Sequence, residues 1–194
     1  MKTVFIDVDT QLDFLYPAGA LYVPGAERIV PAIAQLNRFA ARHNIPVIST
    51  TDAHSENDPE FAVWPPHCIA GTTGQHKAEA TLLEKRVVIP NRECELAIEG
   101  AQQIVVEKQT VDVFQAPNLG RAIERLGGGR FVVYGVVTEI CVAYAVRGLL
   151  KAGKTVVVVT DAVETLRAED SHRALDEMCA GGAGLATVAE VCQG

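Results

Sequence analysis

The chain has 194 residues, 48% of them hydrophobic and 21% charged, which is typical of one compact globular domain over residues 1–194. Its 24 acidic and 17 basic side chains give a net charge of −7, which argues against nucleic acid or an anionic membrane as partners. The sequence has neither a signal-peptide pattern nor an apolar run of the roughly 20 residues that a membrane helix needs, and its five cysteines form no CxxC pair, so we expect a cytoplasmic protein with free thiols.

Predicted strands and helices alternate along the chain. An apolar run at 4–6 precedes a helix that begins near Pro24-Gly25 and has its apolar face at positions 29, 33, 36 and 40. A strand at 46–50, an additional short candidate at 87–89 and a strand at 103–106 follow, and then a helix around 119–126. The remaining elements are a strand at 131–134, a helix at about 140–151, a strand at 155–159, a helix after Asp170-Ser171 and a last strand at 185–188.

This alternation predicts the fold class. Continuous apolar strands, each followed by an amphipathic helix, favour a parallel sheet that is covered on both faces. With right-handed crossovers the result is a three-layer αβα protein with a doubly wound, mainly parallel, six-stranded sheet. Ligands of such sheets bind beyond the carboxyl ends of the strands. The region from about 52 to 102 lacks the strand–helix alternation, so we expect its loops to contribute to the site.

Acidic and histidine side chains follow the first two predicted strands. Asp9 and Asp13 come after the first strand, although by spacing alone either is as well explained as the cap of a turn. Asp52 and His54 come after the second strand, two residues apart, so in an extended segment they point the same way and can reach one metal ion. His67, preceded by two prolines, is a third candidate ligand.

A lysine and a cysteine follow the next strands in the same manner. Lys108 comes directly after the strand at 103–106, and Cys141 stands at the start of the helix after the strand at 131–134. A helix N-terminus lowers the pKa of a thiol and can hold an oxyanion, although a free cysteine is as often a buried structural residue. Because four strand ends each carry a reactive side chain, we favour a catalytic site.

At these residues the sequence resembles the isochorismatase-like cysteine hydrolases, and the resemblance extends over nearly the whole chain. Residues 9–14 are similar to the family's opening motif D-x-Q-x-D-F, and residues 135–142 to its nucleophile motif. The resemblance implies Asp9 as catalytic base, Lys108 as catalytic lysine and Cys141 as nucleophile.

The same motif implies an oxyanion site. In this family the peptide bond between the two residues after the motif's glycine, here Val136 and Val137, is usually cis. The resemblance then implies that the backbone N–H groups of Val137 and Cys141 hold the oxyanion.

Within this family the nicotinamidases carry a metal motif that resembles D-x-H followed by a later histidine. Asp52, His54 and His67 match it, and Glu60, seven residues before the last histidine, is a candidate fourth ligand. The resemblance implies a divalent metal, Zn²⁺ first, with Fe²⁺ or Mn²⁺ as alternatives.

The resemblance also implies a substrate pocket. Phe14 and Trp64 fit the aromatic walls that hold a pyridine ring in nicotinamidases, whereas Ala53 and Val111 stand where these often have aromatic residues. The exact ring substrate therefore stays open.

The activity implied is hydrolysis of nicotinamide to nicotinate and ammonia, a step of NAD salvage, through a thioester on Cys141. The partner is then a small-molecule amide, and the oligomeric state is left open. The alternatives are an amidase for another carboxamide or ureido substrate and a non-enzymatic metal- or redox-sensing module. Two other residues have structural interpretations: Asp13 orients Lys108 or caps its loop, and His172 is a helix cap or a core contact.

Overall fold

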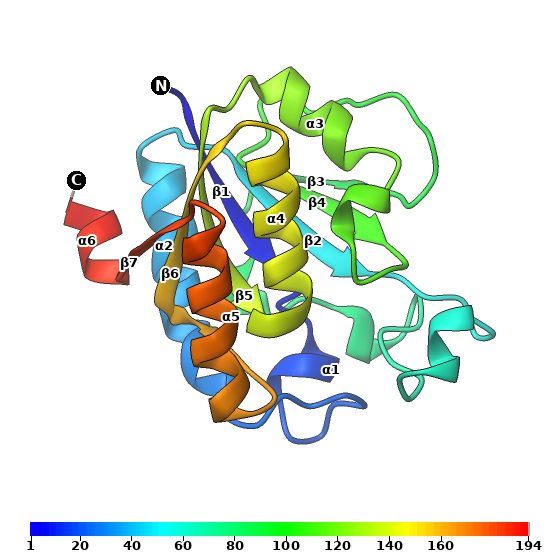
Figure 1. The fold of residues 1–194 in the computed structure, drawn as a ribbon. Helices are drawn as coiled ribbons and strands as arrows, with labels where there is room; N and C mark the ends of the chain where they lie inside the picture. The colour runs from blue at the N-terminus through cyan, green and yellow to red at the C-terminus, as the bar shows by residue number, and fades with distance from the viewer. Residues whose placement is uncertain (194) are drawn as a thin grey trace.

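The computed structural model describes residues 1–193, which form one seven-stranded sheet in the order β3-β4-β2-β1-β5-β6-β7, with all neighbours parallel (Figure 1). The strands are β1 (Thr3–Val8), β2 (Val47–Asp52), β3 (Arg86–Ile89), β4 (Gln103–Lys108), β5 (Arg130–Val136), β6 (Thr155–Glu164) and β7 (Gly184–Ala186). The α-helices are α1 (Leu12–Leu15), α2 (Val30–Arg42), α3 (Leu119–Leu126), α4 (Ala143–Lys151), α5 (Ala168–Ala180) and α6 (Val188–Gln193).

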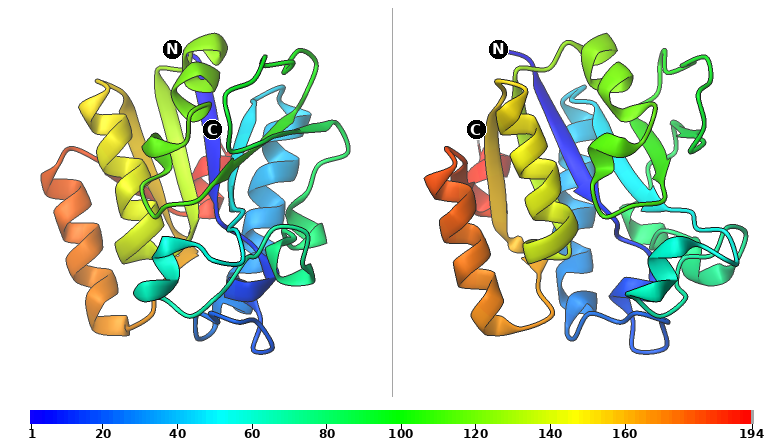
Figure 2. Two further views of the ribbon diagram at one scale, coloured as in Figure 1. Left: turned by 90° about the vertical axis from the view of Figure 1, so that its right-hand side faces the viewer. Right: turned by 45° about the vertical axis from the view of Figure 1, so that its right-hand side comes forward.

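Helices cover both faces of the sheet. Helices α4 and α5 pack together on one face, whereas α2 and α6 lie on the other (Figures 1 and 2). The six residues of β2 are all buried, as are five of the six residues of β1, because a parallel strand in a three-layer fold has no solvent face. The predicted three-layer αβα fold is confirmed.

The predicted number of six strands is wrong. The seventh strand is β3, which pairs with β4 through Val87 and Ile104 at the edge of the sheet. It was hard to recognise because no helix follows it and its outward residues, such as Val88, are exposed.

The last predicted strand, at 185–188, is also too long. The Glu190 carboxylate accepts hydrogen bonds from the backbone N–H and the hydroxyl of Thr187, and this capping interaction starts helix α6 at Val188.

The carboxyl ends of the four central strands converge on one place. The chain passes from β1 to β2 on one side and later returns to β5 on the other side, so the strand order reverses at β1. Asp52 at the end of β2 pairs in register with Lys108 at the end of β4. Gly135 of β5 has φ +118°, and a Cβ there would lie 2.1 Å from the carbonyl oxygen of Val8, so only glycine allows this close approach.

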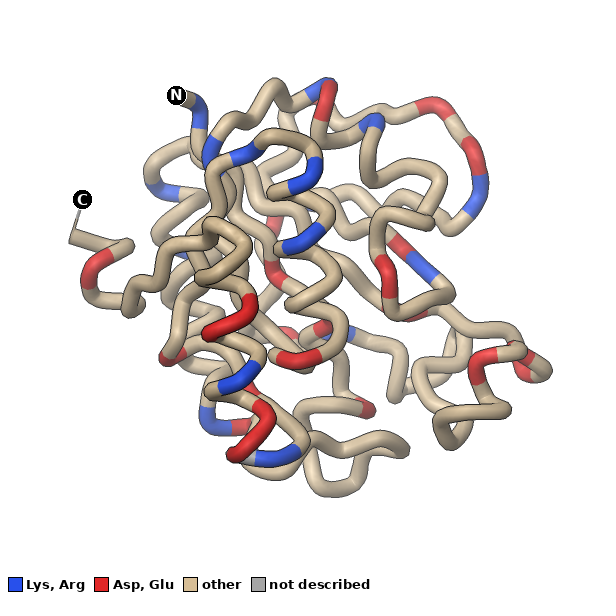
Figure 3. Tube along the Cα trace, in the orientation of Figure 1, with Lys and Arg blue, Asp and Glu red and all other residues tan. Residues whose placement is uncertain are grey.

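The long segment between β2 and β4 closes this end of the sheet. It contains short 3-10 turns at Pro59–Ala62, Thr73–Gln75 and Glu79–Thr81 together with β3. Its first half runs below the strand ends, near α1, in the cyan to green part of Figure 1. Among residues 1–193 no helix combines the length and the apolar character needed to cross a bilayer. In the view of Figure 3 the basic positions are scattered among the acidic ones.

Candidate active site

Three predicted catalytic side chains meet at the carboxyl ends of β1, β4 and β5. The Lys108 side chain is fully buried, and its Nζ lies 3.0 Å from Asp9 Oδ2 and 3.9 Å from Cys141 Sγ. Nζ also donates a short hydrogen bond to Asp52 Oδ1. One buried ammonium group is therefore shared by two carboxylates and one thiol.

Asp9 directly follows β1 in the left-handed backbone region, with φ 48°, which an aspartate tolerates better than most residues. Its Oδ1 accepts a hydrogen bond of 2.6 Å from the Thr50 hydroxyl. Its Oδ2 is buried and accepts no hydrogen bond of good geometry, although Lys108 Nζ lies 3.0 Å away. One lone pair of Asp9 is thus left for a proton.

Burial and the neighbouring charges together set the pKa values of the site. Burial alone would lower the pKa of Lys108, but the carboxylates of Asp52 and Asp9 outweigh it and raise that pKa well above its ordinary value. Burial raises the pKa of the Cys141 thiol well above its ordinary value, against the lowering effect of the Lys108 ammonium. The predicted lowering by the helix terminus is therefore not the net result. Cys141 rests as a neutral thiol, and attack by its sulfur requires a base.

Cys141 lies in a single π-helical turn, Thr138–Val142, which leads into α4. The Val136–Val137 peptide bond before this turn is cis, as the resemblance implied. Val137 and Cys141 both line the pocket in which the thiol lies, and the role of their backbone N–H groups as oxyanion donors stays a prediction.

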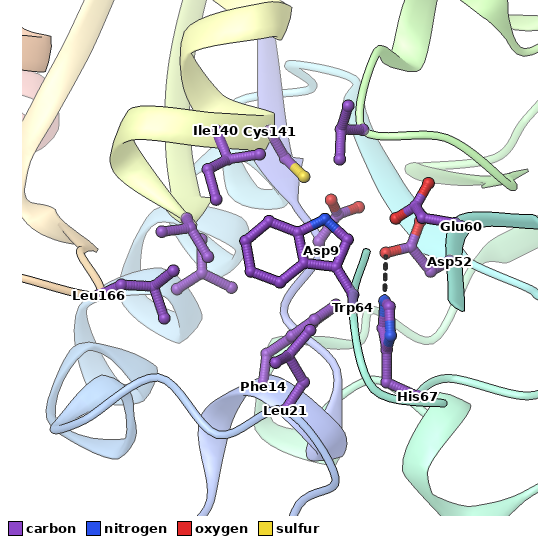
Figure 4. A pocket seen from close by; sticks show the side chains of 13 residues that line it. Asp9, Phe14, Leu21, Asp52, Glu60, Trp64, His67, Ile140, Cys141 and Leu166 are labelled. Atoms are coloured by element: carbon purple, nitrogen blue, oxygen red, sulfur yellow. Dashed lines mark ion pairs between the residues drawn. The ribbon is translucent and has the colours of Figure 1, made fainter. Parts of the chain in front are cut away.

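Asp52, His54 and His67 offer ligand atoms that all lie within 4.8 Å of one another. His67 Nδ1 lies 2.8 Å from the carbonyl oxygen of Pro65, a contact that fixes the proton on Nδ1 and leaves a lone pair on Nε2. Nε2 lies 3.9 Å from Asp52 Oδ2 (Figure 4). Burial also lowers the pKa of His67, which keeps the imidazole neutral, as a metal ligand must be.

His54 completes this group. Its Nε2 lies 3.9 Å from Asp52 Oδ1, is buried and has no hydrogen-bond partner. A buried nitrogen without a partner is costly unless something binds it, so the donor set fits a divalent cation.

Burial raises the pKa of Asp52 to about 7, against the lowering effect of the Lys108 ammonium.

One pocket, with about 400 Å³ of empty space that includes its opening to solvent, is lined by Cys141 and by the metal-ligand candidates Asp52 and His67. Its walls include the predicted aromatic residues Phe14 and Trp64. In Figure 4, Ile140 and Leu166 lie on the opposite side of this pocket from the polar residues Asp52, Glu60 and His67. The pocket therefore suits a small, partly apolar molecule with a polar end.

A family model for the isochorismatase domain matches residues 3–190. The chain belongs to the isochorismatase family. A nicotinamidase from Acinetobacter baylyi is 26% identical over 198 residues, which cover 91% of this chain and 88% of the relative. The nicotinamidase/pyrazinamidase of Mycobacterium tuberculosis is 29% identical over 187 residues, which cover 92% and 94%. The structure of a pyrazinamidase from Pyrococcus horikoshii in complex with zinc matches with a TM-score of 0.83 at 28% identity, covering 96% of this chain and 99% of that one.

These similarities confirm the resemblance to the nicotinamidase branch of the isochorismatase family. They also identify the chain as a hydrolase of amide C–N bonds. The predicted metal site of this isochorismatase-family hydrolase is supported in its location, because the three ligand candidates lie together and a similar protein has been solved in complex with zinc. The identity of the metal stays a prediction.

Two residues that hold the metal-ligand candidates of this hydrolase in place were not predicted from the sequence. Asp58 Oδ2 lies 3.0 Å from His54 Nδ1, and the Asp58 side chain also caps the 3-10 turn that begins at Pro59. Gln11 ties β1 to β2 because its amide donates to the carbonyl of Asp52 and accepts from the N–H of Asp52. An aspartate before a proline is a recognisable turn start, but nothing in the sequence pairs it with His54.

Asp13 caps its loop and does not orient Lys108. Its carboxylate accepts hydrogen bonds from the backbone N–H groups of Cys68 and Ala20, at 2.7 and 2.9 Å, and so braces the segment after His67. A Cβ at Gly74 would lie 2.2 Å from this carboxylate, so glycine is needed there.

Of the two remaining candidates, one stays a prediction and the other is wrong. Glu60 lines the pocket, but its carboxylate is not among the ligand atoms that lie within 4.8 Å of one another, so its role as a fourth ligand stays a prediction. His172 is exposed within α5, whose N-cap is Arg167, so the interpretation as a cap or core contact is wrong.

Proposed function

We propose that this hydrolase converts nicotinamide to nicotinate and ammonia, with Cys141 as nucleophile. The observation that carries the proposal is a single pocket lined by Asp9 and Cys141 and also by the ligand candidates Asp52 and His67. Lys108 contacts the first pair, and His54 lies with the second. Nicotinate and ammonia as products would place the enzyme in NAD salvage.

The first half of the reaction forms a thioester. Asp9 Oδ2 takes the proton of the Cys141 thiol, and the sulfur attacks the carboxamide carbon. The backbone N–H groups of Val137 and Cys141 hold the oxyanion. As the C–N bond breaks, Asp9 returns the proton to the leaving nitrogen, and ammonia departs.

The second half regenerates the enzyme. Asp9 takes a proton from a water molecule, which attacks the thioester carbon, and the C–S bond breaks to release the carboxylic acid. The proton returns to the Cys141 sulfur. Throughout, the Lys108 ammonium balances the negative charge that moves between Asp9 and the sulfur, because its raised pKa keeps it charged.

Asp52, His54 and His67 would hold a divalent metal, Zn²⁺ first and Fe²⁺ or Mn²⁺ as alternatives, with Glu60 as a candidate fourth ligand. When bound, this ion would supply a Lewis acid for the pyridine nitrogen of the substrate. The side chains of Phe14 and Trp64 would enclose the ring and hold the carboxamide toward Cys141.

The test is an assay of ammonia release from nicotinamide, pyrazinamide and an N-carbamoyl amino acid, with metal analysis of the same sample. Nicotinamide is expected to give the highest kcat/KM. A preference for the N-carbamoyl compound would support a related amidase, for which the aliphatic Val111 in the pocket wall is the favouring observation. No ammonia from any amide, together with reversible oxidation of Cys141, would support the sensing module. The buried base Asp9, whose Oδ2 accepts no hydrogen bond of good geometry, argues against that outcome.

A further inference from the structure

The apolar end of the pocket is formed by a loop that is distant in sequence from the catalytic residues. After β6 ends at Glu164, the chain passes through Thr165 and Leu166 into α5. The Leu166 side chain lines the pocket, together with Ile140, opposite the side that carries the metal-ligand candidates (Figure 4). This leucine is therefore placed to contact the part of the substrate that points away from Asp52 and His67.

Glu139, two residues before the nucleophile, fastens this loop. Its Oε1 accepts a hydrogen bond of 3.0 Å from the backbone N–H of Leu166, and its Oε2 accepts one of 2.6 Å from the Thr165 hydroxyl. A third bond joins the same two segments, from the Thr138 hydroxyl to the carbonyl of Glu164, at 2.8 Å. Three hydrogen bonds therefore connect the turn that contains Cys141 to the loop that contains Leu166.

Both oxygens of the Glu139 carboxylate accept hydrogen bonds from the loop. Among residues 1–193, no lysine, arginine or histidine forms an ion pair with it. Hydrogen bonds to a carboxylate are stronger than those between neutral groups, and Thr165 is buried. Removing the carboxylate would leave polar groups unpaired next to the pocket, and the loop would have to move to satisfy them with water.

We propose that Glu139 is a positioning residue that sets substrate affinity through Leu166, without touching the substrate. The proposal rests on the function proposed above, because its kinetic readout uses nicotinamide. A competing explanation is purely electrostatic: a negative charge so near Cys141 would oppose formation of the thiolate. Glu139→Gln separates the two, because it removes the charge and keeps the shape.

The glutamine variant can preserve both contacts. Its amide oxygen can accept from the N–H of Leu166. Its amide N–H can donate to the Thr165 hydroxyl oxygen, whose single proton is then free to bond the carbonyl of Arg167, 3.0 Å away. Glu139→Ala keeps neither contact. Leu166→Ala removes the pocket contact directly and leaves Glu139 in place.

The experiment compares steady-state kinetics on nicotinamide for these three variants and for the double variant Glu139→Ala/Leu166→Ala. Glu139→Ala and Leu166→Ala are expected to raise KM about tenfold, the scale of a lost apolar pocket contact, with kcat within about twofold. Glu139→Gln is expected to keep the KM, the kcat and the pH profile of the wild type. The double variant should have a KM within about twofold of Leu166→Ala, because both changes remove the same contact.

Glu190→Ala is the matched control. Its carboxylate also accepts from a threonine hydroxyl and a backbone N–H, but at α6 and outside the pocket. It is expected to leave KM unchanged. The proposal is overturned if Glu139→Ala leaves KM unchanged, if Glu139→Gln shifts the pH profile and behaves like Glu139→Ala, or if the KM effects of the single variants multiply in the double variant.

A second readout is independent of the substrate. Hydrogen exchange of the Leu166 amide is expected to be faster in Glu139→Ala than in the wild type and in Glu139→Gln, while the exchange of β1 stays unchanged. Equal exchange in all three proteins would overturn the contact between Glu139 and the loop. If the wild type releases no ammonia from nicotinamide, the proposed function fails while this measurement still decides whether Glu139 positions the loop.

Discussion

Two buried lysines lie near the carboxyl end of β1, and their surroundings differ in one respect. Lys77 Nζ lies 3.4 Å from Asp7, and Lys108 Nζ lies 3.0 Å from Asp9 and also pairs with Asp52. Both ammonium groups are almost completely withdrawn from solvent. Burying an ion pair is costly, so each lysine needs well-matched partners.

Around Lys77 every partner is supplied. The Thr10 hydroxyl donates to Asp7 Oδ1 at 2.7 Å, while Ser49 and Asn37 donate to Asp7 Oδ2 at 3.1 and 3.2 Å. Lys77 Nζ also donates to the carbonyl of Thr50. A fully satisfied polar network of this kind fixes neighbouring elements in one arrangement.

Around Lys108 the pairing is incomplete. Among residues 1–193, the buried side-chain nitrogen and oxygen atoms without a hydrogen bond of good geometry are Asp9 Oδ2 and the two ring nitrogens of His54. Charged partners nevertheless lie 3.0 Å from two of these atoms, Lys108 Nζ from Asp9 Oδ2 and Asp58 Oδ2 from His54 Nδ1. All three belong to the candidate active site. Buried polar atoms form complete hydrogen bonds where they serve only the fold, so incompletely bonded atoms such as these mark where a proton or a ligand is received.

The largest effect is expected from removing the nucleophile at the incomplete site. Cys141→Ala should lower turnover of nicotinamide by at least about 10⁴-fold, because no other group in the pocket can form the thioester. Metal content and thermal stability should stay near those of the wild type, since Cys141 is not among the ligand candidates. Retained turnover would remove Cys141 as nucleophile.

Exchanging each lysine for an isosteric apolar residue tests the comparison itself. Lys108→Met should lower kcat/KM by at least about 100-fold, the scale of a lost electrostatic contact to the reacting groups. Lys77→Met should lower the free energy of unfolding by about 3–5 kcal/mol because Asp7 loses its buried partner, while kcat of the folded protein stays within a few-fold. Denaturant titration and steady-state kinetics measure both. Equal losses of activity in the two variants would show that Lys77 is not purely structural and that the contrast with Lys108 is wrong.

Metal binding should depend on His54, whose buried Nε2 has no hydrogen-bond partner. His54→Ala is expected to lose bound metal and to raise KM strongly, and chelation of the wild type should give the same KM. Asp58→Asn should weaken metal affinity about 10–100-fold, because Asp58 holds the His54 ring in place. Elemental analysis and metal titration provide the readout, with Cys141→Ala as the control that keeps its metal. An unchanged metal content in His54→Ala would remove this residue from the site.

The smallest effects are expected from neighbouring residues of β2 that serve the two networks separately. Ser49 donates to Asp7, and Thr50 donates to Asp9 from the opposite face of the strand. Thr50→Val should lower kcat about 5- to 30-fold, equivalent to about 1–2 kcal/mol for one hydrogen bond to a carboxylate. Ser49→Ala should reduce the free energy of unfolding by a similar amount and leave kcat near that of the wild type. A larger loss of kcat in Ser49→Ala than in Thr50→Val would contradict the assignment of Ser49 to the structural network and of Thr50 to the catalytic one.

Much of the site could be predicted from the sequence because it lies at strand ends. Apolar runs identify buried strands, and the residue types that follow them, such as Asp9, Lys108 and Cys141, mark the chemistry. Parallel strands bring their carboxyl ends to the same edge, so a local pattern is enough to gather these side chains. The edge strand β3 was uncertain because half-exposed residues and the absence of a following helix weaken that pattern.

Only the tertiary structure decided how the site is held and charged. Asp58 beside His54, Glu139 on the loop of Leu166 and Asp13 on the segment after His67 are contacts made by loop conformation, which no periodicity encodes. Burial also reversed the expected direction for the pKa of the Cys141 thiol. The sequence by itself determined which reactive groups arrive at one end of the sheet. Packing determined which of these groups form complete hydrogen bonds and which keep an atom available for a proton or a ligand.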